Sequence, residues 1–173
     1  MTPVDKVRAA ARREADAYSA GEERPLGGYV ATMGTYAASV AALVGAGALA
    51  GRRLPERVEP YDVALLGIAT HKLSRLVTKD TVTAPLRAPF TRFEGPQGQG
   101  ELHEEVRGHG LRHTLGELLT CPFCLAQWVA TGFAAGLVFA PRATRLVAAT
   151  FSAVALSDAL QNIYAYLQKT AEE

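Results

Sequence analysis

The sequence predicts an all-α integral membrane protein, a helical bundle of about four transmembrane helices arranged as two hairpins with one polar cytoplasmic loop. Two observations lead to this fold class. Apolar residues make up 49% of the chain, and the polar residues fall into blocks between long apolar runs. The runs at residues 29–50 and 122–140 carry no charged side chain. Each is close to the roughly 20 residues that a helix needs to cross the hydrocarbon core.

The N-terminal segment, residues 1–28, is expected to form a polar and amphipathic helix ahead of the first span. Thr2, Pro3 and Asp5 fit a capping box with proline in the first helical turn. Charged residues precede any apolar run, so a cleaved signal peptide is not expected. We interpret this segment as a solvated helix rather than a dedicated membrane-surface helix.

The helical membrane domain is predicted at residues 29–167, with spans at 29–50, 61–77, 122–140 and 146–167. The second run is the weakest, since it holds one acid, one histidine and two basic residues and is either a span facing a protein interior or a surface helix. These four are Asp62, His71, Lys72 and Arg75. The fourth run contains a single acid, Asp158.

A soluble helical bundle is the competing fold, because the runs are rich in alanine and glycine rather than leucine. A soluble helix should present a polar face on every turn, and the runs at residues 29–50 and 125–140 do not. Gly132 and Gly136 form a small-xxx-small pair that suits close helix packing in lipid. We therefore favour the membrane fold.

The distribution of lysine and arginine predicts the orientation in the membrane. Cytoplasmic segments near spans retain these residues preferentially. They are frequent in the N-terminal tail and in the loop at residues 78–120, whereas the opposite side holds Arg52, Arg53, Arg57, Arg142 and Arg145. We expect a multi-pass protein of the cell membrane with the loop and both termini in the cytoplasm.

The polar loop at residues 78–120 contains apolar residues at near-helical spacing beside basic ones. The basic side chains available to contact anionic lipid headgroups are Lys79, Arg87 and Arg92. Pro85 and Pro89 argue against a long regular helix in this part of the loop. Further on, residues 94–100 are rich in glycine and predict a flexible turn.

The two cysteines, Cys121 and Cys124, stand at the start of the third span with Pro122 between them. At a helix N-cap the helix dipole favours a thiolate, so a redox pair is one interpretation. A second is a tetrahedral zinc site completed by His109 and His113. A third is that both cysteines stay reduced and pack near the membrane boundary.

A polar seam inside the bundle is predicted from His71, Arg75 and Asp158. The second and fourth spans run in the same direction, and Arg75 and Asp158 lie at comparable distances from their starts. An ion pair between them would relieve the cost of burying either charge. The seam is either a proton or substrate pathway or a structural ion pair at the cytoplasmic end.

Composition also excludes some functions. The net charge is +1, without a lysine tract or a basic stripe with interleaved aromatic residues, so a nucleic-acid partner is not expected. Neither a Ser-His-Asp order nor a phosphate-binding glycine loop occurs. We expect a non-enzymatic protein whose partners are the lipid bilayer and either a second copy or another membrane protein.

Two stretches carry a resemblance to a known family. They are HKLSRLVTKDTVTAPLR at residues 71–87 and GELLTCPFCLAQW at residues 116–128. Together they resemble the bacterial membrane family called domain of unknown function 1360, over roughly residues 61–167. The resemblance implies a small helical membrane protein and supplies no established activity.

These observations together predict a structural, scaffold or assembly component of the membrane. The clearest signals are spans and packing residues rather than a catalytic arrangement. The alternative is a membrane thiol-redox or zinc-binding protein centred on Cys121 and Cys124.

Overall fold

The computed structural model describes residues 2–19 and 24–172. The long helices are α1 (Pro3–Ser19), α2 (Leu26–Leu49), α3 (Pro60–Thr78), α6 (Pro122–Phe139) and α7 (Pro141–Glu172). Between α3 and α6 lie the short 3₁₀ helix η1 (Thr81–Thr83), α4 (Ala84–Arg87), the strands β1 (Thr91–Gly98) and β2 (Glu101–Val106), and α5 (Leu111–Thr120). The chain is thus mostly helical, with one small antiparallel hairpin of strands.

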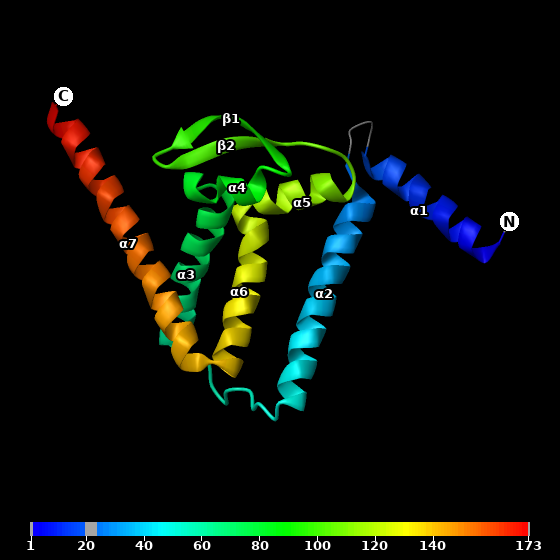
Figure 1. Cartoon of the computed structure of the whole chain (residues 1–173), viewed down its shortest axis with the longest axis horizontal. Coiled ribbons are helices and arrows are strands. Elements are labelled where there is room, and N and C mark those ends of the chain that lie inside the picture. The colour runs from blue at the N-terminus through cyan, green and yellow to red at the C-terminus, as the bar shows by residue number, and fades with distance from the viewer. Residues whose placement is uncertain (1, 20–23, 173) are drawn as a thin grey trace.

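Helices α2, α3, α6 and α7 stand side by side beneath the hairpin, with α6 between α2 and α3 (Figure 1). We call residues 80–120, from the N-cap of η1 to the end of α5, the cap. The opposite end, where residues 50–59 and Ala140 make the connections, is the foot. Helices α2 and α6 run from the cap end to the foot, and α3 and α7 run back. Helix α1 projects sideways from the cap end. The helices thus alternate in direction, and α6 and α7 form one of the two expected hairpins. The other is wrong, because α2 packs against α5 and α6, and α3 packs against α6 and α7.

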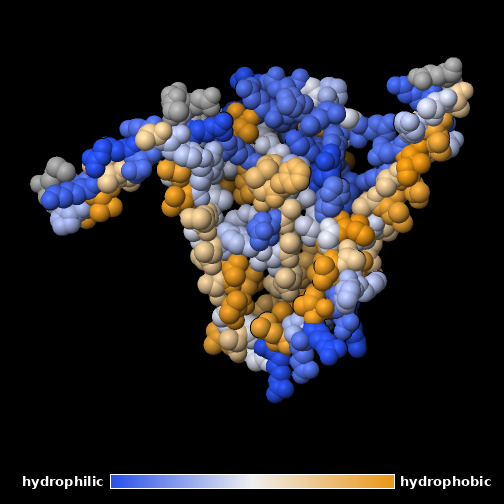
Figure 2. All heavy atoms as spheres, turned by 180° about the vertical axis from the view of Figure 1, so that it is seen from behind, coloured by the Kyte–Doolittle hydropathy of each residue, from blue (hydrophilic) through white to orange (hydrophobic). Residues whose placement is uncertain are grey.

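Three helices in the described part of the chain are long and apolar enough to cross a membrane, namely α2, α6 and α7 up to Ala171. On the face of the molecule that Figure 2 shows, the bundle presents a largely apolar band between a hydrophilic cap and a hydrophilic foot. Helix α3 is not among them, because the charged side chains at both of its ends lower its hydropathy. The prediction is therefore confirmed for the helical class and for three candidate spans.

Helix α3 lies at the centre of the bundle, packed against α6 and α7. The buried core consists of Leu65 and Ala69 of α3, Phe133 of α6 and Ala148 of α7. The two alanines are fully buried, and such small side chains let helix backbones approach closely. The hydroxyl of Ser152 on α7 donates to the carbonyl oxygen of Leu65 at 3.0 Å, which adds a polar tie between the two helices.

The predicted glycine pair on α6 packs through one member only. A Cβ placed on Gly136 would lie 2.5 Å from Oγ1 of Thr144 on α7, so only glycine fits there. A Cβ on Gly132 would meet nothing within 4 Å. The close approach belongs to the tight α6–α7 turn, where Ala140 alone separates the two helices and Pro141 opens α7.

The cap replaces the polar loop expected at residues 78–120 with folded structure. The prediction of a flexible turn over residues 94–100 is wrong for most of that range, because β1 continues to Gly98 and pairs with β2. The register shifts between Phe93 and Gly95 and again between Pro96 and Gly98. Bulges of this kind accommodate glycine and proline in an edge strand, so turn-forming residues here sit within a strand.

The N-terminus of α1 has the predicted capping box. The backbone N–H of Thr2 donates to Oδ2 of Asp5 at 2.8 Å, and the N–H of Asp5 donates to Oγ1 of Thr2 at 3.2 Å. The side-chain hydrogen bond from Thr2 holds the pKa of Asp5 below its ordinary value. Nothing in α1 is buried, and Val4, Val7 and Tyr18 are exposed.

Candidate functional site

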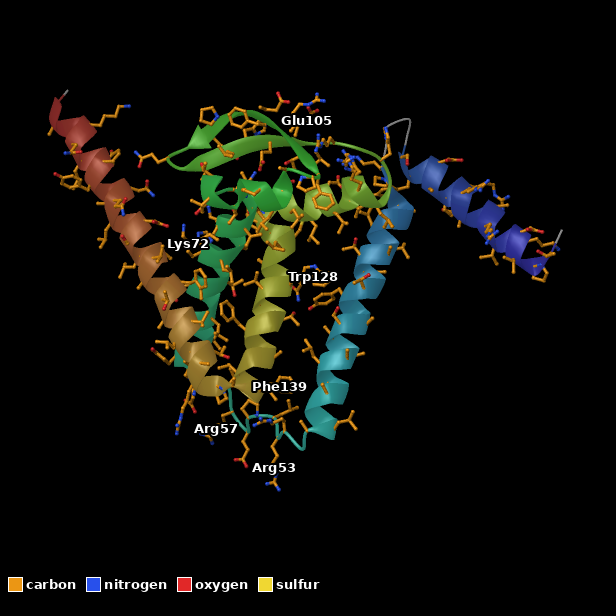
Figure 3. The ribbon with its side chains drawn as sticks, in the orientation of Figure 1. Arg53, Arg57, Lys72, Glu105, Trp128 and Phe139 are labelled. Atoms are coloured by element: carbon orange, nitrogen blue, oxygen red, sulfur yellow. A yellow bond between two sulfur atoms is a disulfide. The ribbon has the colours of Figure 1, made fainter. Side chains whose placement is uncertain are left out.

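A polar pocket of about 550 Å³ lies where the cap meets α3 and α7. Helix α3 contributes His71, Lys72 and Arg75, and the cap contributes Asp80, Gln99, Gly100 and Glu101. Helix α7 contributes Asp158, Gln161 and Asn162. Figure 3 shows Lys72 on the side of α3 that faces α7. All three residues of the predicted polar seam therefore line one pocket, at the cap end of the bundle.

Lys72 is the central cation of this pocket. Its Nζ lies 2.9 Å from Oδ2 of Asp158 on α7 and 3.4 Å from Oδ2 of Asp80 in the cap. The side chain of Lys72 is only 13% exposed, whereas that of Asp158 is 45% exposed. One ammonium group thus ties α3 to both α7 and the cap.

The positions of the two residues in their spans had suggested Arg75 as the ion-pair partner of Asp158. In the structure the partner is Lys72. Arg75 lies nearly one helical turn closer to the cap, and its guanidinium reaches the hairpin instead. Its Nη2 lies 2.6 Å from both carboxylate oxygens of Glu101, and its Nε lies 3.0 Å from Oε1. His71 lines the same pocket and is exposed.

Arg87 is the most deeply buried charged side chain in the cap. It is fully buried and forms an ion pair with Glu104, whose side chain is 6% exposed. Its Nη1 donates to the carbonyl oxygen of Val77 and to Oγ1 of Thr83, both at 2.8 Å, and Nη2 donates to the carbonyl oxygen of Asp80 at 3.1 Å. The prediction that Arg87 contacts lipid headgroups is wrong, because a fully buried guanidinium reaches no lipid.

The position of Arg87 explains how the cap is attached to α3. The last carbonyl groups of a helix have no partners within the helix and carry partial negative charge. Arg87 neutralises this charge at Val77, and the hydroxyl of Thr83 donates to the carbonyl oxygen of Leu76. Of the other two predicted headgroup contacts, Arg92 is exposed on β1 and Lys79 is partly exposed at the end of α3.

The two cysteines form a disulfide at the start of α6. Cys121 is the N-cap residue, as predicted, with Pro122 in the first helical position. The backbone N–H of Cys124 donates to Sγ of Cys121 at 3.1 Å. The interpretation that both cysteines stay reduced does not hold in this structure, because both are engaged in the disulfide.

The predicted zinc ligands do not come together. His109 and His113 line a pocket of about 580 Å³ beside residues of α1 and α2. Nε2 of His113 lies 3.5 Å from Oε1 of Glu117. The cysteines line a different cleft. The rise of a helix separates His113 from Cys121 by about 12 Å along α5. No group of three potential metal ligands occurs among residues 2–19 and 24–172.

The cleft that the cysteines line lies between α2 and α6, beneath α5, and has a volume of about 660 Å³. The sequence did not predict this cleft. Trp128 extends from α6 toward α2 (Figure 3) and meets Tyr36 edge to face, with ring centroids 5.1 Å apart. The Tyr36 hydroxyl lies 2.8 Å from Oγ1 of Thr131 and accepts a hydrogen bond from Gln127 at 2.7 Å. The available signal was an aromatic residue inside each of the two apolar runs, Tyr36 at residues 29–50 and Trp128 at residues 122–140.

A small-residue contact closes this cleft at the cap end. Gly28 on α2 is buried, and a Cβ placed there would lie 2.1 Å from Oγ1 of Thr114 on α5. The next residue of α2, Tyr29, donates its hydroxyl to Oε1 of Glu117, one turn along α5 from Thr114, at 3.1 Å. Helix α2 is therefore attached to α5 near the cap and to α6 through Tyr36.

Comparisons with known proteins give the family. Residues 65–164 match the family described as Protein of unknown function (DUF1360). Sporulation protein YjcA of Bacillus subtilis (strain 168) is 37% identical over 71 residues, which are 39% of this chain and 60% of that protein. The match thus spans less than two thirds of the relative's length, and no solved structure matches the chain. The family match covers more than half of the sequence and includes the cysteine pair and the polar pocket, and the chain belongs to the DUF1360 family.

Proposed function

We propose that this protein is a four-span membrane protein that serves as a structural or assembly component, with its cap at one membrane surface. The observation that carries the proposal is the exposed apolar surface of the bundle (Figure 2). Large apolar side chains such as Met33, Val44, Leu146 and Leu156 are more than half exposed. A water-soluble bundle would bury such a surface, whereas lipid covers it in a membrane protein.

The direction of the helices supports α3 as the fourth span. Helices α2 and α6 both begin at the cap and end at the foot, so the chain must return to the cap between them (Figure 1). Helix α3 makes this return. Its charged residues pair with neighbouring elements, Asp62 with Arg145 and Lys72 with Asp158, which reduces the cost of placing them in a bilayer.

For the orientation, we propose that the cap and both termini lie in the cytoplasm. Of the 18 lysine and arginine residues, the foot holds Arg52, Arg53, Arg57, Arg142 and Arg145, and the cap end holds the others. Positively charged segments close to spans are preferentially retained in the cytoplasm. Figure 3 shows Arg53 and Arg57 at the foot, opposite Glu105 of the cap.

Reporter fusions test the number of spans and the orientation together. Fusions after residues 57 and 142 should report the outside, and a fusion in the β2–α5 connection should report the cytoplasm. Fractionation with alkaline carbonate should leave the full chain in the membrane pellet. The same compartment for residue 57 and the cap would eliminate α3 as a span, and a soluble chain would eliminate the membrane role altogether.

The structural role is supported by how the charged groups of the polar pocket are used. Lys72 and Arg75 each join two or more elements through carboxylates, an arrangement that holds the bundle together. An assembly component should bind a second copy or another membrane protein. Co-expression of two differently tagged copies, followed by purification on one tag and mass spectrometry, should recover the other copy or a membrane partner. Recovery of a monomer alone would contradict the assembly role.

A further inference from the structure

The disulfide joins two sulfur atoms in different surroundings. Cys121 is partly buried at the N-cap, and Cys124 is exposed in the first turn of α6. Phe123, between them, is 90% exposed, so the bond lies at the surface of the protein rather than in its core. Both cysteines also line the cleft between α2 and α6, which opens a second side of the bond to an incoming group.

The surroundings favour negative charge on one of the two sulfurs. Sγ of Cys121 accepts the backbone N–H of Cys124 at 3.1 Å and lies at the positive end of the α6 dipole. A thiolate at Cys121 is therefore stabilised, which makes it the better leaving group when the bond is broken. Cys124, more accessible and one turn into the helix, is the sulfur that an incoming thiolate meets first.

We propose that Cys121–Cys124 is a redox-active disulfide that undergoes exchange with thiols. A thiolate attacks Sγ of Cys124 and forms a mixed disulfide, while the bond between the two protein sulfurs breaks and Cys121 leaves as the thiolate. A second thiol attacks the mixed disulfide. Two thiols thereby become one disulfide, and Cys121 and Cys124 take up the two electrons and two protons as a dithiol.

The substrate class is thus a thiol, either a small molecule or a cysteine of a partner protein. The proposal goes beyond the structural role above and does not depend on it, because the geometry of the bond is the same whether or not the bundle spans a membrane. The two ideas also fail separately, since reporter fusions do not respond to the redox state of the cysteines.

The unmodified protein provides the first test, in detergent micelles. Reduced glutathione and reduced thioredoxin are used in separate arms, and a maleimide polymer then counts free thiols by gel shift. We expect both thiols to appear together in the folded protein. Reaction with glutathione identifies a small-molecule source, and reaction with thioredoxin alone identifies a protein source. A bond that resists both reagents until the protein is unfolded would overturn the proposal.

Two single variants test which sulfur does what, and the chain suits them because it has only two cysteines. With oxidised glutathione, C121S should form a mixed disulfide at Cys124 that persists. In C124S the N–H at position 124 remains, so Cys121 should be alkylated at pH 6 about tenfold faster than Cys124 in C121S.

The other titratable groups that line the cleft are Tyr29, Tyr36 and Glu117, and both single variants retain all three. The variant with both cysteines replaced by serine is the blank, and circular dichroism checks that each variant is folded. Equal alkylation rates at the two positions, or no mixed disulfide in folded C121S, would overturn the proposed roles.

Discussion

Arg145 and Asp62 form a two-pronged ion pair across the foot of the bundle. Nε of Arg145 lies 2.8 Å from Oδ1 of Asp62, and Nη2 lies 2.7 Å from Oδ2. The pair joins the first turn of α3 to the beginning of α7. The side chain of Asp62 is 7% exposed and that of Arg145 is 47% exposed, so one partner is buried and the other reaches the surface.

We predict that Asp62→Asn destabilises the protein. The loss should be smaller than that for a fully buried pair, because Arg145 regains contact with solvent. Thermal unfolding in micelles measures the change. Arg142→Gln, at an exposed neighbouring arginine, is the control and should change little. Equal stability of Asp62→Asn and the wild type would mean that the pair does not hold the foot together.

We predict that Asp158 is energetically coupled to Lys72 and not to Arg75. The double-mutant cycle of Asp158→Asn with Lys72→Met should give a coupling energy of about 0.5–1.5 kcal/mol, because the two side chains touch at 2.9 Å. The cycle of Asp158→Asn with Arg75→Gln should be additive within about 0.5 kcal/mol. A larger coupling with Arg75 would contradict the arrangement of the polar pocket.

We predict that Arg87→Lys loosens the cap. A lysine keeps the positive charge but cannot replace the planar group that reaches Glu104, Val77 and Asp80 together, so the loss should be about 1–3 kcal/mol, as for buried polar groups left without a partner. In the Arg87→Lys variant, the rate of amide hydrogen exchange should increase over the wild type in β1 and β2, and it should increase less in α6. The matched control is Arg92→Lys on the exposed side of β1, expected to stay within about 0.5 kcal/mol of the wild type. Unchanged protection of the hairpin in Arg87→Lys would show that the cap does not depend on this contact.

We predict that Gly136→Ala destabilises the α6–α7 hairpin by about 1–3 kcal/mol, because the new methyl group would overlap Thr144. Gly132→Ala is the control, since nothing lies within 4 Å of its added carbon. Combining Gly136→Ala with Thr144→Ala should restore part of the lost stability by removing the atoms that clash. Comparable losses at Gly132 and Gly136, measured by thermal unfolding, would argue against this close contact.

The helices were predictable from sequence and the cap was not, for physical reasons. Long uncharged runs leave few alternatives to helices, which is why the limits of α2 and α6 fall within a few residues of those expected. The hairpin contains glycine and proline, so its local pattern indicates a turn. Its pairing depends on docking to α3 through Arg87 and Glu104, a contact between residues 17 positions apart that no local pattern reveals.

The location of the polar pocket was predictable from the sequence, but the ion pairs within it were not. Hydropathy and span direction predicted that His71, Arg75 and Asp158 lie at the same level of the bundle, and they line one pocket. They did not determine the partner, because a choice between Lys72 and Arg75 depends on helix rotation and on Glu101 from the cap. Likewise, the sequential proximity of His113 and Cys121 gave no measure of their separation along α5.

The one-residue connection between α6 and α7 also constrains how the protein is made. Ala140 spans at most about 3.6 Å, whereas the hydrocarbon core is about 30 Å thick. In the four-span arrangement proposed above, a folded α7 therefore could not stay on the side from which the chain emerges once a folded α6 had crossed. The two helices would cross as one hairpin, with Arg142 and Arg145 carried together at its leading end.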